Sequence, residues 1–420
     1  MSTPTRIQAS VGAALAVVLL AAGAALAARP PVRARTASDA APCADPYSSV
    51  RDPQNPLMLP VAPGASDPLR GASFFVDGPT HGDAAGEIAR LLGIDSNVPI
   101  GAYLPAFPDD ESWATFENYV AQQLPSQTPS VQRKITLLEK IADEPEAQRI
   151  SAGAEGGNTA DFTRKLFCHN FTADPGAIPI ITTYFLHEVL HGCPTTAQID
   201  AYMPKFKQQI DGIVQQTGNR PAVYLLEIDG IGSSGCISKI GSMPAWEAAL
   251  RYEVDSFATL PHAVVYVEGG YSDANTPRYT ARILNAINVG RIQGFFTNDT
   301  HENWTSKEIA WGDQVSKLTH GAHFIVNTAQ NGNGPKLNRH PTTQGVEDLC
   351  NPPGRALGPV PNTDTGFSQV DAFLWTYVPG NSSGSCGGGP ASGIFWPARA
   401  EALAANANDR LGPGYASDPY

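Results

Sequence analysis

The feature that most constrains the fold is a regular alternation of short apolar segments and amphipathic segments that begins near residue 145. The apolar segments are rich in β-branched and aromatic residues and recur at residues 178–186, 222–228, 263–269, 293–298, 323–329 and 371–378. One apolar stripe with helical spacing runs through residues 196–216, Gly218 and Pro221 end it, and another helix is expected after Pro244. Apolar strands that alternate with amphipathic helices predict a parallel sheet covered by helices. Their number and the length of the chain favour an α/β barrel over an open sheet.

Polar residues gather where these predicted strands end. Glu227 and Asp229 close the segment that starts at residue 222, and Glu268, Asn298 and Asn327 close the next three. Barrels of this class place their active sites at the carboxyl ends of the strands. The sequence therefore predicts a functional site built from these ends.

Charge narrows the class of ligand. The 420 residues carry a net charge of −12, and 42% of them are apolar, which is enough for a large buried core. An acidic protein of this kind is a poor partner for nucleic acid or for an anionic membrane surface, and it suits a neutral or cationic ligand. We expect a monomer.

The N-terminal segment indicates export. Residues 10–28 are almost wholly apolar, they follow Arg6, and the run closes with a small-residue cleavage pattern at Ala27. Residues 1–28 are therefore predicted to be a signal peptide, and an uncleaved membrane anchor is the alternative. Residues 29–70, rich in Pro and Ala, are expected to form a linker and a loosely packed lead-in, and residues 71–420 one barrel domain. Either way the protein is predicted to be secreted or otherwise exported.

His187, Glu188 and His191 spell the H-E-x-x-H pattern of zinc proteases. The β-branched residues before the pattern are poor helix formers, and Pro194 follows it closely, so a zinc-binding helix is disfavoured here. The extended pattern would also need a histidine at position 197, which is alanine. We keep a zinc metalloprotease as a remote alternative, expect no bound metal, and place these residues on a strand-to-loop turn at the barrel mouth.

Several longer stretches resemble glycoside hydrolase family 6. The stretches are "YLLEIDG" (224–230), "DLCNPPGRALGP" (348–359) and "VDAFLWTYVPGNSSGSCGGGP" (370–390). Residues 141–153, 311–318 and 327–335 also match the family in order. Members of this family cut β-1,4-glucan with inversion and fold as a distorted parallel barrel with a cleft over the strand ends. The resemblance therefore implies an exported inverting glycoside hydrolase that needs no cofactor and acts on β-1,4-glucan or a related polysaccharide. A catalytically weak carbohydrate-binding relative is the alternative.

The resemblance also implies roles for individual residues. Asp229 matches the family's general acid, and Tyr184 matches its active-site tyrosine. We expect Glu227 to lie on the same side of an extended strand as Asp229, where one like charge raises the pKa of the other. Of the tryptophans Trp246, Trp304, Trp311, Trp375 and Trp396, most are expected in the core, and Trp304 is the best cleft candidate. The predicted substrate-binding residues are Asn298, Trp304, Tyr377, Asn351 and Glu268.

An even number of cysteines in an exported chain favours disulfides, and spacing alone leaves every pairing open. The resemblance implies the pairs Cys193–Cys236 and Cys350–Cys386, each tying a loop at the barrel mouth. Cys43 and Cys168 remain and could pair.

The sequence departs from the family at several supporting positions. The aspartate that assists the acid is missing from the stretch around His187, and Tyr377, Asn381 and Ser383 stand where the family has a sugar-binding lysine, a glutamate and the proposed base. Tyr271 stands in place of the family's histidine, and Leu349 in place of a tryptophan. An inverting enzyme still needs a base, and the candidates that the sequence leaves open are Glu188, Glu268, Asp273 and Asp299.

Overall fold

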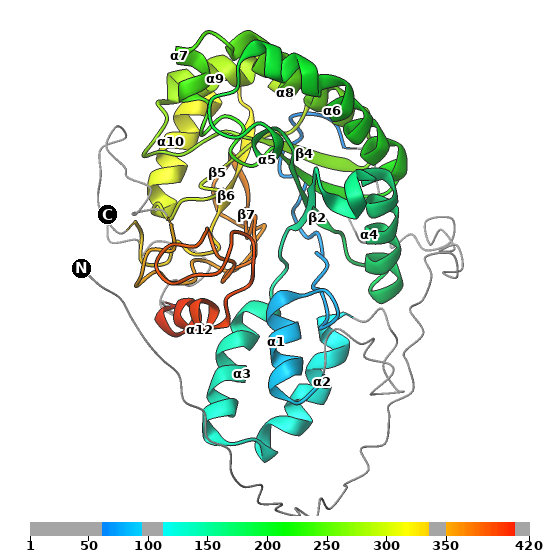
Figure 1. Ribbon diagram of the computed structural model, residues 1–420, viewed down its shortest axis with the longest axis vertical. Helices are drawn as coiled ribbons and strands as arrows, with labels where there is room; N and C mark the ends of the chain where they lie inside the picture. Colours follow the sequence, from blue (N-terminus) through cyan, green and yellow to red (C-terminus); the bar gives the residue numbers. More distant parts are fainter. Residues whose placement is uncertain (1–60, 95–111, 336–349, 408–420) are drawn as a thin grey trace, which may run out of the picture. The chain divides into compact units, whose positions relative to one another are not determined.

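The computed structural model describes residues 61–94, 112–335 and 350–407. Within these residues, seven strands form one sheet in chain order, and every neighbouring pair is parallel. A parallel bridge between Glu146 and Trp375 brings the two edges of the sheet together, and the Ala147 N–H donates to the Trp375 carbonyl at 3.1 Å. The predicted distorted parallel barrel is confirmed (Figure 1). The strands are β1 (Gln148–Ser151), β2 (Ile180–Tyr184), β3 (Ala222–Leu226), β4 (Ala263–Glu268), β5 (Gly294–Thr297), β6 (His323–Asn327) and β7 (Val370–Leu374).

Helices surround the sheet and precede it in the chain. Figure 1 shows α4, α6, α8, α9 and α10 as a layer outside the strands. The helices are α1 (Asp83–Leu91), α2 (Trp113–Gln123), α3 (Pro129–Ala142), α4 (Thr159–Ala173), α5 (Leu186–Val189), α6 (Thr196–Thr217), α7 (Gly235–Lys239), α8 (Met243–Phe257), α9 (Pro277–Ala286), α10 (Thr305–Leu318) and α12 (Pro397–Asn406). Short 3₁₀ turns lie at η4 (Leu124–Ser126), η5 (Ala154–Gly157) and η6 (Val289–Arg291).

Both faces of the sheet are buried, which explains why β3 is apolar at every position. Tyr224 and Leu226 of β3 pack outward against the helical layer, whereas Val223 and Leu225 pack inward with residues of the other strands. Side chains alternate between the faces of a strand, so a strand covered on both sides is apolar at most of its positions.

Each of the six apolar segments predicted from the sequence contains a strand, and the two predicted helices are α6 and α8. Helix α6 starts at a capping box, in which the Thr195 side chain accepts from the Gln198 N–H and the Gln198 side chain accepts from the Thr195 N–H. Helix α8 has Pro244 in its first turn, as expected. Strand β1 was not predicted, because it is short and Ile150 is its one fully buried residue.

Helices α1, α2, α3 and α12 share a separate apolar cluster that the sequence analysis did not predict. Phe116 and Leu138 are fully buried in it, and it also includes Trp375, which follows β7. Leu69 is fully buried against the inner residues of the strands, so the described end of the predicted lead-in, residues 61–70, packs on the barrel. The predicted signal peptide or anchor lies outside the described residues. Within those residues no helix is long and apolar enough to span a bilayer.

Candidate active site

The chain turns sharply where β3 ends. Glu227 and Asp229 both have positive φ angles, 52° and 61°. The expectation that they share one side of an extended strand is wrong, because the strand ends at Leu226. Glu227 is fully buried, and its two carboxylate oxygens accept from the backbone N–H groups of Phe185 and Leu186 at 3.0 and 2.9 Å. Burial raises the pKa of Glu227. Its two backbone hydrogen bonds anchor the residues that follow β2, whereas Asp229 stays partly exposed.

One oxygen of Asp229 is held by two hydroxyl groups. The Tyr271 hydroxyl donates to Asp229 Oδ1, and the Thr300 hydroxyl donates to the same oxygen at 3.1 Å. Burial and the negative charge of Asp229 raise the pKa of Tyr271 well above its usual value, so the phenol keeps its proton and stays a donor. This arrangement leaves Asp229 Oδ2 as the oxygen that can meet a ligand.

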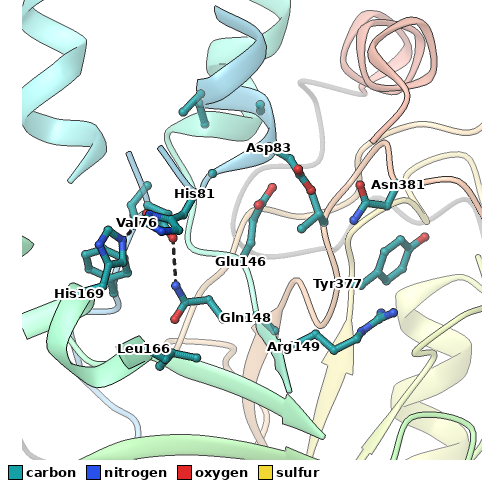
Figure 2. Close-up of a pocket in the computed structure, with 18 of the residues that line it drawn as sticks. Val76, His81, Asp83, Glu146, Gln148, Arg149, Leu166, His169, Tyr377 and Asn381 are labelled. Carbon is teal, nitrogen blue, oxygen red and sulfur yellow. Dashed lines mark hydrogen bonds and ion pairs between the residues drawn. The ribbon is translucent and has the colours of Figure 1, made fainter. Parts of the chain in front are cut away.

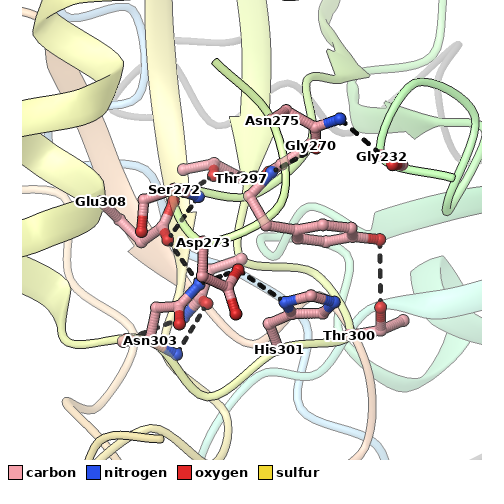
Figure 3. A network of polar contacts seen from close by, with 12 residues as sticks. Gly232, Gly270, Ser272, Asp273, Asn275, Thr297, Thr300, His301, Asn303 and Glu308 are labelled. Atoms are coloured by element: carbon pink, nitrogen blue, oxygen red, sulfur yellow. Dashed lines mark hydrogen bonds and ion pairs between the residues drawn. The ribbon is translucent and has the colours of Figure 1, made fainter. Parts of the chain in front are cut away.

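A buried network holds Tyr271 in place (Figure 3). The His301 ring stacks on Tyr271, with centroids 3.8 Å apart and planes 6° apart. His301 Nδ1 lies 2.8 Å from Asp273 Oδ1, and the Asn303 side-chain amide donates to Asp273 and to Glu308 at 2.7 and 2.9 Å. Burial alone would lower the pKa of His301. The hydrogen bond to Asp273 and the negative charge of Asp273 outweigh burial, so the pKa of His301 is raised. The imidazolium that this favours is compensated by the Asp273 carboxylate beneath the site.

Tyr184 lies half-buried at the end of β2, the strand next to β3. Burial, together with the negative charge of Asp229, raises the pKa of Tyr184 to about 12. The Arg149 guanidinium lies 5.5 Å from the centre of the Tyr184 ring, in cation–π geometry. Arg149 was not predicted from the sequence, although it lies within the matched stretch 141–153, because an arginine in a strand with little apolar pattern gives no signal of its own.

Three of the predicted substrate-binding residues use their polar groups inside the protein. Glu268 is fully buried, and one of its oxygens accepts from the backbone N–H groups of Ile231 and Gly232 at 2.6 and 2.9 Å. The Asn298 amide donates to the backbone carbonyls of Asn303, in the loop before α10, and of Asn327, at the end of β6. The Asn351 amide donates to the loop that ends at Cys386. These side chains shape the loops of the site from below.

The remaining two predicted binding residues are partly exposed. Tyr377 lies at the wall of a cavity of about 510 Å³ that Glu146, Gln148 and Arg149 also line (Figure 2). Trp304 is half-buried and packs against Gly334, where an added Cβ would meet the indole at 2.1 Å. Of the other tryptophans, Trp246, Trp311 and Trp375 are buried, as expected for most of them, and Trp396 is half-buried.

The four candidate bases occupy different surroundings. Asp299 is fully buried and accepts from the Thr376 hydroxyl at 2.7 Å; burial, followed by the charge of Asp229, raises the pKa of Asp299 to about 7. Glu268 and Asp273 belong to the internal contacts described above. Glu188 is half-buried and accepts from the Ala152 N–H at 2.5 Å. Ser383, at the family's base position, is exposed.

The H-E-x-x-H residues do not share a helix. Helix α5 ends at Val189, so His187 lies on a single helical turn and His191 lies in the exposed loop beyond it. The edge of the His187 ring packs against Trp246, with centroids 5.6 Å apart. A zinc helix needs both imidazoles on one face of regular turns, and the backbone here does not provide that face.

Two disulfides tie loops of the chain, as predicted. Cys193 pairs with Cys236 and Cys350 pairs with Cys386, with Cα atoms 5.6 and 6.0 Å apart. Cys168 lies in α4. Its predicted partner Cys43 lies outside the described residues, so that pairing stays a prediction.

Comparison with known proteins decides the family. Residues 110–407 match the model of the glycosyl hydrolases family 6. The chain belongs to this family. The resemblance stated from the sequence motifs is thereby confirmed.

Curated relatives within the family are longer than the matched region. Endoglucanase A of Cellulomonas fimi is 29% identical over 297 residues, which cover 70% of this chain and 60% of that protein. Endoglucanase A of Thermobispora bispora is 31% identical over 240 residues, which cover 56% of this chain and 50% of that protein. The chain therefore spans between half and two thirds of the length of these two relatives.

Solved structures of family 6 members share the fold. The endoglucanase Cel6 from Mycobacterium tuberculosis, in complex with methyl-cellobiosyl-4-deoxy-4-thio-β-D-cellobioside, aligns with a TM-score of 0.54 at 31% identity and covers 64% of this chain and 89% of that one. The endoglucanase CEL6B from Humicola insolens aligns with a TM-score of 0.57 at 17% identity and covers 82% of this chain and all of that one. The second match supports the fold alone.

Proposed function

We propose that this protein is an exported, inverting glycoside hydrolase that acts on β-1,4-glucan or a related polysaccharide, with Asp229 as its general acid. The observation that carries the proposal is the environment of Asp229, which follows β3 with one oxygen held by Tyr271 and Thr300 and the other left for a ligand. The family membership supports the reaction class, and the relatives named as endoglucanases support the substrate class.

In the proposed reaction Asp229 carries its proton on Oδ2 and gives it to the glycosidic oxygen as the bond from that oxygen to the anomeric carbon breaks. Water attacks the opposite face of the sugar and loses a proton to a base, so the anomeric configuration inverts. The Asp229 carboxyl group becomes negative as its proton leaves. Charge-assisted hydrogen bonds from Tyr271 and Thr300 to Oδ1 then strengthen, which stabilises the transition state more than the ground state.

Tyr184 and Arg149 supply the other wall of the proposed site. The tyrosine ring offers an apolar face to a sugar, and the guanidinium over it offers donors for sugar hydroxyls. Tyr377, at the wall of the adjoining cavity, would extend this surface along a bound chain. A neutral glycan suits such a site, because the charged side chains of the network beneath it are already paired with one another.

Export is part of the proposal. Two disulfides within the described residues are typical of proteins that fold in an oxidising compartment. The predicted signal peptide at residues 1–28 provides the route.

A catalytically weak carbohydrate-binding relative is the second candidate. The observation that favours it is the set of carboxylates near the site, since Ser383 stands exposed at the family's base position while Asp299 and Glu268 are fully buried. The second candidate therefore supposes that no carboxylate serves as the base.

A polysaccharide panel separates the two candidates. The purified protein is incubated with cellulose, soluble β-1,4-glucan, mixed-linkage β-glucan and an α-glucan control, and new reducing ends are measured. If the protein is an inverting hydrolase, we expect new reducing ends from β-1,4-linked glucans. NMR should then detect the α-anomer as the first product. Binding of cello-oligosaccharide without turnover on any β-glucan would refute the hydrolase and support the binding protein.

A further inference from the structure

Three potential metal ligands from distant parts of the chain meet beside the cavity. Asp77 and His81 come from the segment that leads into α1, and His169 comes from α4. One ligand atom from each lies within 4.8 Å of the others. His169 Nε2 is 2.8 Å from Asp77 Oδ1, and the ring centroids of His81 and His169 are 4.2 Å apart. Figure 2 shows His81 and His169 side by side.

We propose that Asp77, His81 and His169 bind one divalent transition metal ion, with zinc as the best fit. Two imidazole nitrogens and one carboxylate oxygen are a common three-ligand set for zinc, and a water can complete the tetrahedron. Ligand atoms about 2.0–2.1 Å from a tetrahedral zinc lie about 3.3 Å from one another. The pair of Asp77 and His169 already has close to this separation, so small side-chain movements suffice to admit the ion.

Neighbouring side chains orient these ligands. The Gln148 amide donates to Asp77 Oδ2 at 2.9 Å, which turns Oδ1 toward the histidines. Gln148 is held in turn by the Asn170 amide, which donates to its carbonyl oxygen at 2.7 Å. The edge of Phe75 packs against the ring of His169, which is itself buried. Such outer contacts fix the orientation of metal ligands in known sites.

A hydrogen-bonded pair of Asp77 and His169 is the competing explanation, and it predicts no metal binding by this cluster. His81 is exposed, and its ring lies against the ring of His169. A metal ion held by both rings would join the segment before α1 to α4 and, through Gln148, to β1. The ion is thus expected to stabilise the fold, and the site is separate from His187 and His191.

Metal titration of the full chain tests the proposal. The protein is stripped with chelator, dialysed, and titrated with ZnCl₂ and with CoCl₂. We expect one equivalent of zinc to bind, a Co²⁺ visible absorption band typical of low coordination number, and a higher Tm with zinc. Excess Ca²⁺ should leave the zinc in place, because calcium prefers oxygen ligands.

Matched histidine variants locate the ion. His81→Ala should weaken zinc binding at least about 10-fold and remove the zinc-dependent rise in Tm. Because His81 is exposed, we expect the circular dichroism spectrum of this variant to match that of the unchanged protein. His191→Ala, also exposed, should bind zinc as the unchanged protein does. No stoichiometric zinc binding, full binding by His81→Ala, or loss of binding in His191→Ala would each overturn the proposal.

Discussion

Tyr271 takes a position where the family pattern has histidine, and its hydroxyl meets Asp229 directly. A phenol with a raised pKa is a donor at every physiological pH, whereas a histidine can lose or gain a proton in that range. The substitution therefore changes how the proposed acid is supported. It also supplies a hydrogen-bond donor next to a carboxyl group that lacks the family's assisting aspartate.

Tyr271→Phe should lower the rate of hydrolysis. The ring and its stacking on His301 remain, but the hydrogen bond that stabilises the Asp229 carboxylate in the transition state is lost. A loss of about 1–2 kcal/mol of transition-state stabilisation corresponds to roughly a 5- to 30-fold fall in kcat, and we expect little change in KM. Tyr224→Phe is the matched control, since that buried hydroxyl bonds only Thr217 among the described contacts. Equal losses in both variants would contradict a specific role for Tyr271.

Gly232 leaves room for the Tyr271 ring. A Cβ at this position would lie 2.2 Å from a ring carbon of Tyr271. Gly232→Ala should displace the ring from Asp229, lower activity more than Tyr271→Phe does, and cost about 1–3 kcal/mol of unfolding free energy. Gly235→Ala is the control, because nothing lies within 4 Å of its added Cβ. Kinetics and urea unfolding of both variants check this, and a fully active Gly232→Ala would show that the ring position is unimportant.

Sequence motifs predicted Asp229 and Tyr184 as site residues, and the periodicity of apolar residues predicted where the strands end. The sequence did not reveal that Glu227, Glu268 and Asn298 point into the protein. The direction of a side chain after a strand depends on the backbone, and the positive φ angles of Glu227 and Asn298 are not encoded by a simple pattern. The cluster of Asp77, His81 and His169 was equally hidden, because His169 is far from the other two in the chain.

At the level of elements, the loops at the carboxyl ends of the strands are held by covalent and polar ties. The disulfide between Cys193 and Cys236 links the loop before α6 to the start of α7, across 43 residues of chain. Glu227 and Glu268 hold neighbouring turns through backbone N–H groups. The proposed acid thus emerges from a segment fixed on both sides.

Replacing both cysteines of this disulfide by serine should destabilise the protein. The chain-entropy model gives about 3–4 kcal/mol for a closed loop of this size. We expect the midpoint of urea unfolding to fall while the far-ultraviolet circular dichroism spectrum of the folded state is kept. The unchanged protein should lose a similar free energy on reduction of this disulfide, and an unaltered midpoint in the double variant would contradict the expectation.

Strand β1 and helices α1 to α3 were not predicted from the sequence, and all of them lie before the first predicted strand segment at residue 178. Strand β1 is four residues long, and its exposed arginine is followed directly by a buried isoleucine. Helices α1 to α3 lie outside the region of regular alternation that begins near residue 145. Their apolar residues pack against α12, which lies at the other end of the sequence, and such a contact leaves no local signal.

Across the whole molecule, many carboxyl groups are buried, and burial disfavours their charged form. Burial raises the pKa of Asp299 and of Glu302 to about 7 each, and it raises the pKa of Glu268 well above its usual value. A carboxyl group whose pKa is higher in the folded state binds its proton more tightly there than in the unfolded chain. Its favourable contribution is complete below the unfolded pKa of about 4 and is lost as the pH rises through the folded value.

Stability should therefore fall between about pH 5 and pH 8. Each pKa shift of this size corresponds to a few kcal/mol of unfolding free energy, on the order of 3 kcal/mol for Glu302. Glu302→Gln should make the decrease in unfolding free energy with pH smaller, because it removes one buried group that ionises. Glu117 is exposed, so Glu117→Gln should leave that decrease unchanged. Urea unfolding at pH 5, 6, 7 and 8 measures this. A stability that rises over the same interval would contradict the account.

The most direct test of the central claim compares Asp229→Asn with the unchanged protein on two cello-oligosaccharide substrates that differ only in the leaving group. Asparagine keeps the shape of the side chain and removes the proton that is transferred. With a sugar as leaving group we predict a rate loss of roughly 10²–10⁴-fold. With dinitrophenolate, which needs no protonation, the loss should be less than about 10-fold, and Ser383→Ala should match the unchanged protein on both substrates. An equal loss on the two substrates would show that Asp229 is not the general acid.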